Sequence, residues 1–298
     1  MTRAGFVGLA GRPNVGKSTL VNAMVGARVA IVSDRPQTTR RAARGVATDL
    51  EAGWQLVLID LPGVQRPRDT LTKRMQRRVE REMADADVAL MVVNGAQGIG
   101  PGDRFIAKLL RRGASDKVPV ICAVNKSDMT DHVRMVETLS AAERLEGVDE
   151  IFPISARRGT GLKVLINRLA ELMPEGSYMY PPEERSDQPS ETMLAELIRE
   201  QILNRTRDEI PHSVEVKILD TSQREDGLVT IRAEVWAETE SQKAILIGKG
   251  GSKVREVGIA ARRSLEVEVG DRVHLDLQVR VRRGWRKDDA LLDRLGIE

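Results

Sequence analysis

The stretch GRPNVGKS at residues 11–18 constrains this chain more than any other sequence feature. It follows an apolar run at 6–10 that predicts a strand, and it precedes residues 19–25, which predict a helix. In that setting small residues let successive backbone N–H groups point into one concavity, and the helix start adds positive potential. Lys17 can reach the β and γ phosphates of a nucleotide, and the Ser18 hydroxyl can ligate Mg²⁺. We therefore predict a phosphate-binding loop rather than an ordinary glycine turn.

Residues 1–173 alternate between predicted strands and predicted helices. Such alternation is typical of an α/β fold with a doubly wound, mostly parallel sheet that is covered on both faces. The predicted strands are 6–10, 44–47, 54–59, 88–93, 120–124 and 151–154, and the predicted helices are 19–25, 66–83, 103–112 and 162–173.

The predicted strand 54–59 runs into Asp60-Leu61-Pro62-Gly63. A carboxylate at the C-terminal end of a strand lies at the sheet edge where phosphate ligands bind in such folds. We expect Asp60 to hold Mg²⁺ through water, and the Gly63 N–H to approach the terminal phosphate, because no side chain blocks it. Alone this pattern is usually a turn, but after a phosphate-binding loop it indicates a nucleotide site.

The segment Asn125-Lys126-Ser127-Asp128 follows the predicted strand 120–124 and favours one base. The Asp128 carboxylate can accept hydrogen bonds from the ring N–H and the exocyclic amine of guanine. Adenine lacks that donor pair and would leave a buried carboxylate unpaired. Lys126 can pack its stem over the ring. After the last predicted strand comes Ser155-Ala156-Arg157, where the Ala156 N–H is expected to meet the guanine carbonyl oxygen.

These motifs occur in the order seen in translation-factor-class GTPase domains, which the N-terminal half resembles. The resemblance implies GTP or GDP and Mg²⁺ as ligands, with a threonine that closes over the metal. That threonine is Thr38 or Thr39, and we favour Thr39 because related bacterial GTPases place it directly before an arginine. The implied nucleotide contacts are Gly11, Asn14, Val15, Gly16, Lys17, Ser18, Thr19, Asp60, Gly63, Asn125, Lys126, Asp128, Ser155, Ala156 and Arg157. The implied metal ligands are Ser18, Thr39 and Asp60, and the implied catalytic residues are Lys17, Thr39, Gly63 and Asn14.

One position departs from the pattern of signalling GTPases. Many of them carry a glutamine directly after Asp-x-x-Gly to orient the attacking water, but here that position is Val64, and Gln65 follows. Asn14 matches bacterial relatives that use K⁺ as an activating cation, which would stabilise developing charge much as an arginine finger does. We therefore expect slow intrinsic hydrolysis that K⁺ or a bound partner accelerates.

Residues 174–190 are rich in proline and charge and predict a semi-rigid linker. After it, residues 191–298 predict helix, strand, strand, helix, a Gly-x-x-Gly turn, helix and strand. That order and turn resemble a smaller α+β domain, the type II KH domain, which binds RNA. The alternative is an ordinary turn between two helices.

The expected RNA contacts form two basic patches. In the first, the turn lets a nucleic-acid backbone approach closely, and Ile245, Ile247 and Val254 are expected to floor a groove for bases. In the second, arginines surround Trp285, whose ring can stack on bases; its alternative role is a core residue. The candidates are Ile247, Gly248, Lys249, Gly250, Gly251, Lys253, Arg255, Arg262, Arg263, Arg280, Arg282, Arg283, Trp285 and Arg286. Because residues 174–298 hold 20 basic against 25 acidic residues, this prediction depends on local patches rather than on total charge.

Taken along its whole length, the chain resembles the bacterial ribosome-assembly GTPases that join an Era-like GTPase domain to a type II KH domain. The resemblance implies binding near the 3′ end of small-subunit (16S) rRNA, a role in small-subunit maturation, a monomer, and a cytoplasmic location with peripheral contact to the inner face of the cell membrane. The basic residues of the predicted helix 66–83 favour a polyanion such as RNA or an anionic membrane surface, or else a solvated face. A membrane-associated signalling switch and an RNA scaffold stabilised by nucleotide remain the alternatives. The single cysteine, Cys122, excludes a disulfide framework and is expected to be a buried strand residue.

Overall fold

The computed structural model describes residues 1–33, 35, 38–64, 69–113, 118–206 and 210–297, and its chain divides into two compact units. The first unit contains residues 1–30, 39–68 and 72–187, and the second contains 31–38, 69–71 and 188–298. Gln65, Arg66 and Arg68 lie outside the described residues. Residues 174–187, which we predicted to be part of a linker, belong to the first unit, because the buried Gln55 amide binds the backbone of Met179 and Tyr180.

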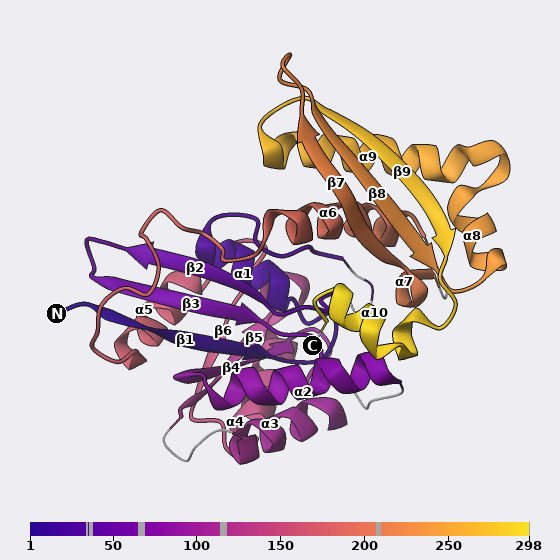
Figure 1. Cartoon of the computed structure of the whole chain (residues 1–298). Helices are drawn as coiled ribbons and strands as arrows, with labels where there is room; N and C mark the ends of the chain where they lie inside the picture. The colour runs from indigo at the N-terminus through magenta and orange to yellow at the C-terminus, as the bar shows by residue number, and fades with distance from the viewer. Residues whose placement is uncertain (34, 36–37, 65–68, 114–117, 207–209, 298) are drawn as a thin grey trace. The chain divides into compact units, whose positions relative to one another are not determined.

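The first unit is a six-stranded sheet with strand order β2-β3-β1-β4-β5-β6 (Figure 1). Among the described strands of this sheet, only β2 pairs antiparallel, because it joins β3 through a tight turn at Gly53; the other pairs are parallel. The predicted doubly wound α/β fold is therefore confirmed. The strands are β1 (Arg3–Ala10), β2 (Ala43–Asp49), β3 (Trp54–Asp60), β4 (Val88–Asn94), β5 (Val120–Asn125) and β6 (Glu150–Pro153).

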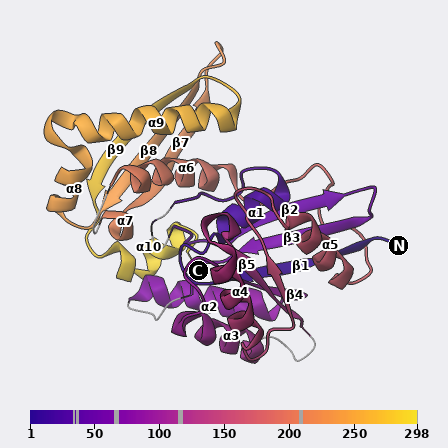
Figure 2. The same ribbon diagram turned by 180° about the vertical axis from the view of Figure 1, so that it is seen from behind.

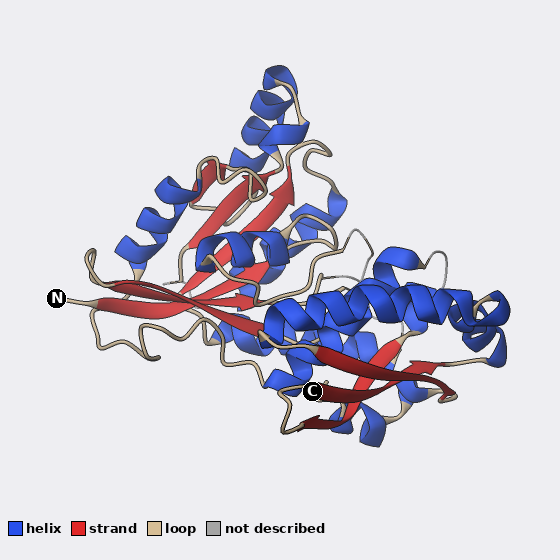
Figure 3. Cartoon of the chain, turned by 90° about the horizontal axis from the view of Figure 1, so that it is seen from above, coloured by secondary structure: helices blue, strands red, loops and turns tan. Residues whose placement is uncertain are grey.

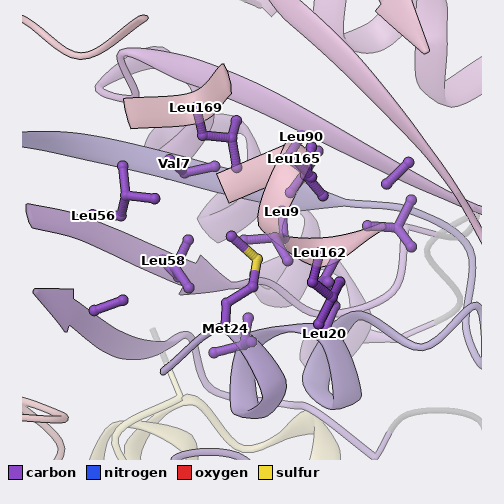
Figure 4. Packing of buried hydrophobic residues seen from close by; sticks show 14 of the residues in the cluster. Val7, Leu9, Leu20, Met24, Leu56, Leu58, Leu90, Leu162, Leu165 and Leu169 are labelled. Carbon is purple, nitrogen blue, oxygen red and sulfur yellow. The ribbon is translucent and has the colours of Figure 1, made fainter. Parts of the chain in front are cut away.

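Helices cover both faces of this sheet. The helices are α1 (Lys17–Val25), α2 (Thr70–Ala84), α3 (Pro101–Gly113), α4 (His132–Glu143) and α5 (Leu162–Leu172), with a short 3₁₀ turn η1 (Ser127–Met129). One core joins α1 and α5 to the sheet, as in the leucine cluster of Figure 4, and another core on the opposite face joins α2, α3 and α4. The turned view in Figure 2 shows the α3 and α4 side.

The second unit has its own three-stranded sheet, ordered β7-β8-β9, drawn in red in Figure 3. Strands β7 and β8 are antiparallel and β8 and β9 are parallel, as a helical connection between β8 and β9 requires. A single core joins this sheet to its helices, so the predicted α+β domain is confirmed. The elements are α6 (Ser190–Arg205), α7 (Ile210–Ser213), β7 (Glu215–Gln223), β8 (Val229–Ala237), α8 (Glu240–Ile247), η2 (Lys249–Gly251), α9 (Ser252–Val269), β9 (Val273–Val281), η3 (Trp285–Lys287) and α10 (Asp289–Arg294).

Cys122 lies in the middle of β5 and is fully buried, which makes it a reporter of unfolding in the first unit. Burial raises the pKa of its thiol to about 12. At pH 8 we expect a soluble aromatic disulfide to label the native chain more than about 10³-fold more slowly than the chain in denaturant, since the thiolate is the reactive form. Rapid labelling of the native protein would contradict this packing.

Candidate nucleotide and RNA sites

The loop that follows β1 has the backbone shape of a phosphate cradle. Gly16 adopts a left-handed conformation (φ 99°) at the start of α1, and a Cβ built on it would come within 2.4 Å of Asn125 Nδ2. Gly11 is equally constrained, because its Cβ would meet the Val92 carbonyl oxygen at 2.4 Å. Glycine is therefore required at both positions, and the backbone amides between them can face a ligand without side chains in the way.

Lys17 is buried inside this loop. Its Nζ donates to the carbonyl oxygens of Gly11 at 3.2 Å and Arg12 at 3.3 Å, which encloses the ammonium within the turn. Burial lowers the pKa of Lys17, and the negative charge of Asp60 partly offsets this effect. A buried cation held by two carbonyls is suited to bind the terminal phosphates of a nucleotide.

Three oxygen-bearing side chains meet beside the loop. Ser18 Oγ donates to Asp60 Oδ2 at 2.6 Å, Thr39 Oγ1 donates to the same oxygen at 3.2 Å, and the two hydroxyl oxygens lie 3.1 Å apart. Burial raises the pKa of Asp60, while Lys17 and the two hydroxyls act in the opposite direction. The other carboxylate oxygen, Oδ1, is buried and has no hydrogen-bond partner among the described residues. The site offers a cluster of oxygen atoms that can act as metal ligands and a buried carboxylate oxygen without a hydrogen bond. Both features fit Mg²⁺, which prefers oxygen ligands.

This cluster includes Thr39 and not Thr38. The Thr38 hydroxyl instead donates to the Arg35 carbonyl oxygen at 2.6 Å. We expect Thr39→Ala to raise the Mg²⁺ concentration needed for half-maximal GTP hydrolysis by about tenfold to 100-fold, because one oxygen ligand is lost. Thr38→Ala should leave the Mg²⁺ titration of GTP hydrolysis near that of the unmodified chain. The reverse ranking would assign the metal-closing role to Thr38.

The predicted base-recognition residues are also brought together. Asn125 Nδ2 donates to the Val15 carbonyl at 2.9 Å, and Lys126 Nζ donates to the Asn14 carbonyl at 2.8 Å. These bonds tie the base-recognition segment to the phosphate loop. Both Asn14 and Lys126 have left-handed backbones, with φ of 62° and 67°.

Asp128 is held as an acceptor by the next motif. Ser155 Oγ donates to Asp128 Oδ1 at 2.6 Å, and this bond is the main reason that the pKa of Asp128 is lowered. A carboxylate kept ionised can accept two donors from guanine. The Ala156 N–H donates to Asn125 Oδ1 at 2.9 Å, a contact that sequence analysis missed. A guanine carbonyl would have to share this N–H.

In the second unit, the turn between α8 and α9 depends on glycine. Gly248 has φ 73° and ψ 170°, a region that is essentially restricted to glycine, and Gly250 and Gly251 also have positive φ. Beside the turn, Lys249 is exposed, and Lys253 pairs with Glu256 at 3.0 Å. Ile245 is 55% exposed, which leaves an apolar side chain available beside the cations.

Comparison with known proteins places both units in one family. The first unit matches the family model "50S ribosome-binding GTPase" over residues 6–126, and the second matches "KH domain" over 209–286. Two curated relatives carry the name GTPase Era. That of Mycobacterium tuberculosis (strain ATCC 25618 / H37Rv) is 45% identical over 98% of each chain, and that of Mycolicibacterium smegmatis is 44% identical over 99% of this chain and 98% of the relative. The chain belongs to the GTPase Era family. It is therefore a GTPase, as the order of its motifs predicted.

Solved structures of Era agree over the full length. A crystal structure of a point variant of Aquifex aeolicus Era bound to GDP·AlF₄⁻ has a TM-score of 0.94 and 31% identity, and covers 99% of both chains. A crystal structure of Era with MgGDPNP and nucleotides 1506–1542 of 16S ribosomal RNA also has a TM-score of 0.94 and 31% identity, covering 100% of this chain and 99% of the other.

One predicted RNA contact of this Era-family chain is wrong. Trp285 is fully buried and its Nε1 donates to the Ser213 carbonyl oxygen at 3.1 Å, so the ring is a core residue that a base cannot reach. The sequence could not reveal this, because a tryptophan among arginines fits either role. The neighbouring arginines remain candidates: Arg282 and Arg283 are exposed, and Arg282 lies 5.6 Å over the Trp236 ring.

Arg12 was not among the predicted site residues. Its Nε donates to Asp103 Oδ1 at 2.9 Å, and that carboxylate is completely buried while its other oxygen accepts the Gly100 N–H at 2.9 Å. The pair fixes the phosphate loop to the start of α3. The sequence signal for this pair was Asp103 at the start of the predicted helix 103–112. A carboxylate there usually accepts hydrogen bonds from free backbone N–H groups.

Proposed function

We propose that this chain is a GTP-switched RNA-binding protein that assists assembly and maturation of the small ribosomal subunit by binding 16S rRNA near its 3′ end. The observation that carries the proposal is the full-length likeness to Era in complex with MgGDPNP and nucleotides 1506–1542 of 16S ribosomal RNA. We assign residues 1–173 to the GTPase domain, 174–190 to the connecting segment, of which 174–187 pack on the first unit, and 191–298 to the RNA-binding domain. Binding of GTP with Mg²⁺ would order the segment around Thr39 and Gly63 and change the affinity of the chain for RNA.

The proposed roles follow from the contacts above. Lys17 and the amides of residues 11–18 would hold the phosphates, and Ser18, Thr39 and Asp60 would hold Mg²⁺. When bound, that ion would offset negative charge on the β and γ phosphates. Val64 is buried and has no hydrogen-bonding group in its side chain, so it cannot orient the attacking water.

The test is binding of an RNA copy of nucleotides 1506–1542 to the full chain with GDPNP, with GDP and with no nucleotide. We expect affinity to depend on the nucleotide, and RNA to change nucleotide affinity by the same factor. A shuffled RNA of the same length is the control. Equal affinity in all three states would contradict the switch, and equal binding of the shuffled RNA would contradict the specific site.

We further propose that Asn14 contacts an activating K⁺ next to the phosphates. Asn14 lies within the phosphate loop and has a left-handed backbone, with φ of 62°. Hydrolysis should be faster in K⁺ than in Na⁺ at equal ionic strength, and Asn14→Ala should remove that difference. Equal rates of the unmodified chain in the two salts would contradict the proposal.

A peripheral contact with an anionic membrane surface is a second proposed role. Lys73, Arg77 and Arg81 are exposed and recur every four residues on α2, which places them on one face. No helix within the described ranges is long and apolar enough to span a bilayer. Sedimentation of the chain, which we expect to be a monomer, with anionic but not zwitterionic vesicles would support this role; no sedimentation with either would contradict it.

A further inference from the structure

The segment 31–38 belongs to the second unit, although it comes from the N-terminal half of the chain. Its described residues are bonded to α6 and to the residue that ends this helix. The Val32 N–H donates to Glu200 Oε1 at 3.0 Å, and Arg35 Nη2 donates to the Thr206 carbonyl oxygen at 3.2 Å. These bonds fasten the first part of the segment to α6.

A buried cation holds the end of the segment. Arg199 lies on α6 and is completely buried; its Nε and Nη2 donate to the two carboxylate oxygens of Glu196, and Nη2 also donates to the Thr38 carbonyl oxygen. A guanidinium that water cannot reach is costly unless acceptors satisfy its donors. Moving the Thr38 carbonyl away would remove one of these acceptors, so this carbonyl is fixed in place and in direction.

The fixed carbonyl belongs to the peptide unit that joins Thr38 to Thr39. A peptide unit is planar and rigid, and it includes the Cα atom of the residue that follows. Holding the carbonyl therefore sets the point from which the Thr39 side chain starts. The Thr39 hydroxyl lies in the oxygen cluster with Ser18 and Asp60 that fits Mg²⁺. Arg199 thus acts on this cluster through a single peptide unit.

We infer that Arg199 is a positioning residue for GTP hydrolysis: by holding the Thr38 carbonyl, it places the Thr39 hydroxyl where it can ligate Mg²⁺. This inference rests on the proposed metal role of Thr39 and deepens it, because the side chain that places this ligand comes from the domain to which we assign RNA binding. Arginine suits the task, because its planar group donates to several acceptors at once and stays charged when buried.

The test is the double variant Glu196→Gln/Arg199→Met in the full chain, because removal of the cation alone would leave a buried carboxylate unpaired. Methionine is long and apolar and has no N–H donor. We expect the Mg²⁺ concentration for half-maximal binding of GDPNP to rise about tenfold, as for loss of an outer partner of a metal ligand. At low Mg²⁺, kcat for GTP hydrolysis should fall by a similar factor, and excess Mg²⁺ should restore it.

A conservative variant and a matched control separate positioning from general damage to α6. Arg199→Lys keeps one cation but loses the planar fork, so we expect a smaller rise in the Mg²⁺ requirement, about threefold. Arg205→Met makes the same chemical change on the same helix. Arg205 donates to Gln201 Oε1 at 2.7 Å and lies 3.6 Å from Glu256, so its loss should leave the Mg²⁺ titration unchanged.

Thermal unfolding shows whether each variant folds. A folded double variant with an unchanged Mg²⁺ titration would overturn the inference, and so would a loss of kcat that excess Mg²⁺ does not restore, or an equal effect of Arg205→Met. If the double variant does not fold, Arg199→Lys decides in the same way. If Thr39→Ala itself leaves the Mg²⁺ titration unchanged, the proposed metal role of Thr39 fails, and the inference fails with it.

Discussion

Replacing Asp128 with asparagine is expected to lower GTP affinity by about 10³-fold or more and to make xanthosine triphosphate the better ligand. We expect the carboxylate to accept two donors from guanine, and the Ser155 hydroxyl that donates to it lowers its pKa. An asparagine amide offers one acceptor and one donor, so it would leave the exocyclic amine of guanine facing an N–H. Xanthine has a carbonyl at that place, which the amide can satisfy.

The measurement is competitive equilibrium binding of the two nucleotides to both proteins. Asp131→Asn is the matched control, because Asp131 lies three residues away and caps α4 by accepting the Arg134 N–H at 2.7 Å. It should leave nucleotide preference unchanged. Retention of GTP preference by Asp128→Asn would remove Asp128 from base recognition.

Replacing Lys17 with alanine is expected to reduce kcat/KM for GTP hydrolysis by about 10²–10³-fold, the usual effect of losing one charge-stabilising donor. The ammonium donates to the carbonyl oxygens of Gly11 and Arg12, which hold it inside the phosphate loop. Lys108→Ala is the control, since Lys108 is exposed on α3 and lies 3.9 Å from Glu146. Steady-state phosphate release measures both variants.

Circular dichroism should show that Lys17→Ala folds. If the variant folds and hydrolyses GTP normally, the phosphate loop is misassigned. If it folds, has lost hydrolysis and yet supports subunit assembly, the nucleotide has only a structural role and the chain acts as an RNA scaffold.

The phosphate loop, Asp60 and the base-recognition segment could be predicted because each is a short motif whose chemistry depends on spacing along the chain. Helix α4 could not. Its buried side chains are Thr138 and Ala142, which are small or polar and give no apolar periodicity. Thr138 instead docks by donating to the Gly95 carbonyl at 3.1 Å.

Two further features depend on partners far away in the sequence. Trp285 is buried because its indole finds the Ser213 carbonyl, and the Ala156 N–H is occupied because Asn125 turns towards it. Local spacing carries no information on either bond. Helix α2 begins at Thr70 among the described residues, and residues 66–68 of the predicted helix lie outside them.

The bonds from Asn125 to Val15 and from Lys126 to Asn14 have a consequence for how nucleotide leaves the protein. The segment that reads the base and the loop that holds the phosphates cannot move separately without breaking these bonds. A displacement of either one is therefore expected to weaken the contacts to both the base and the phosphates. We therefore expect that displacing the segment around Lys126 speeds GDP release without any contact to the phosphates.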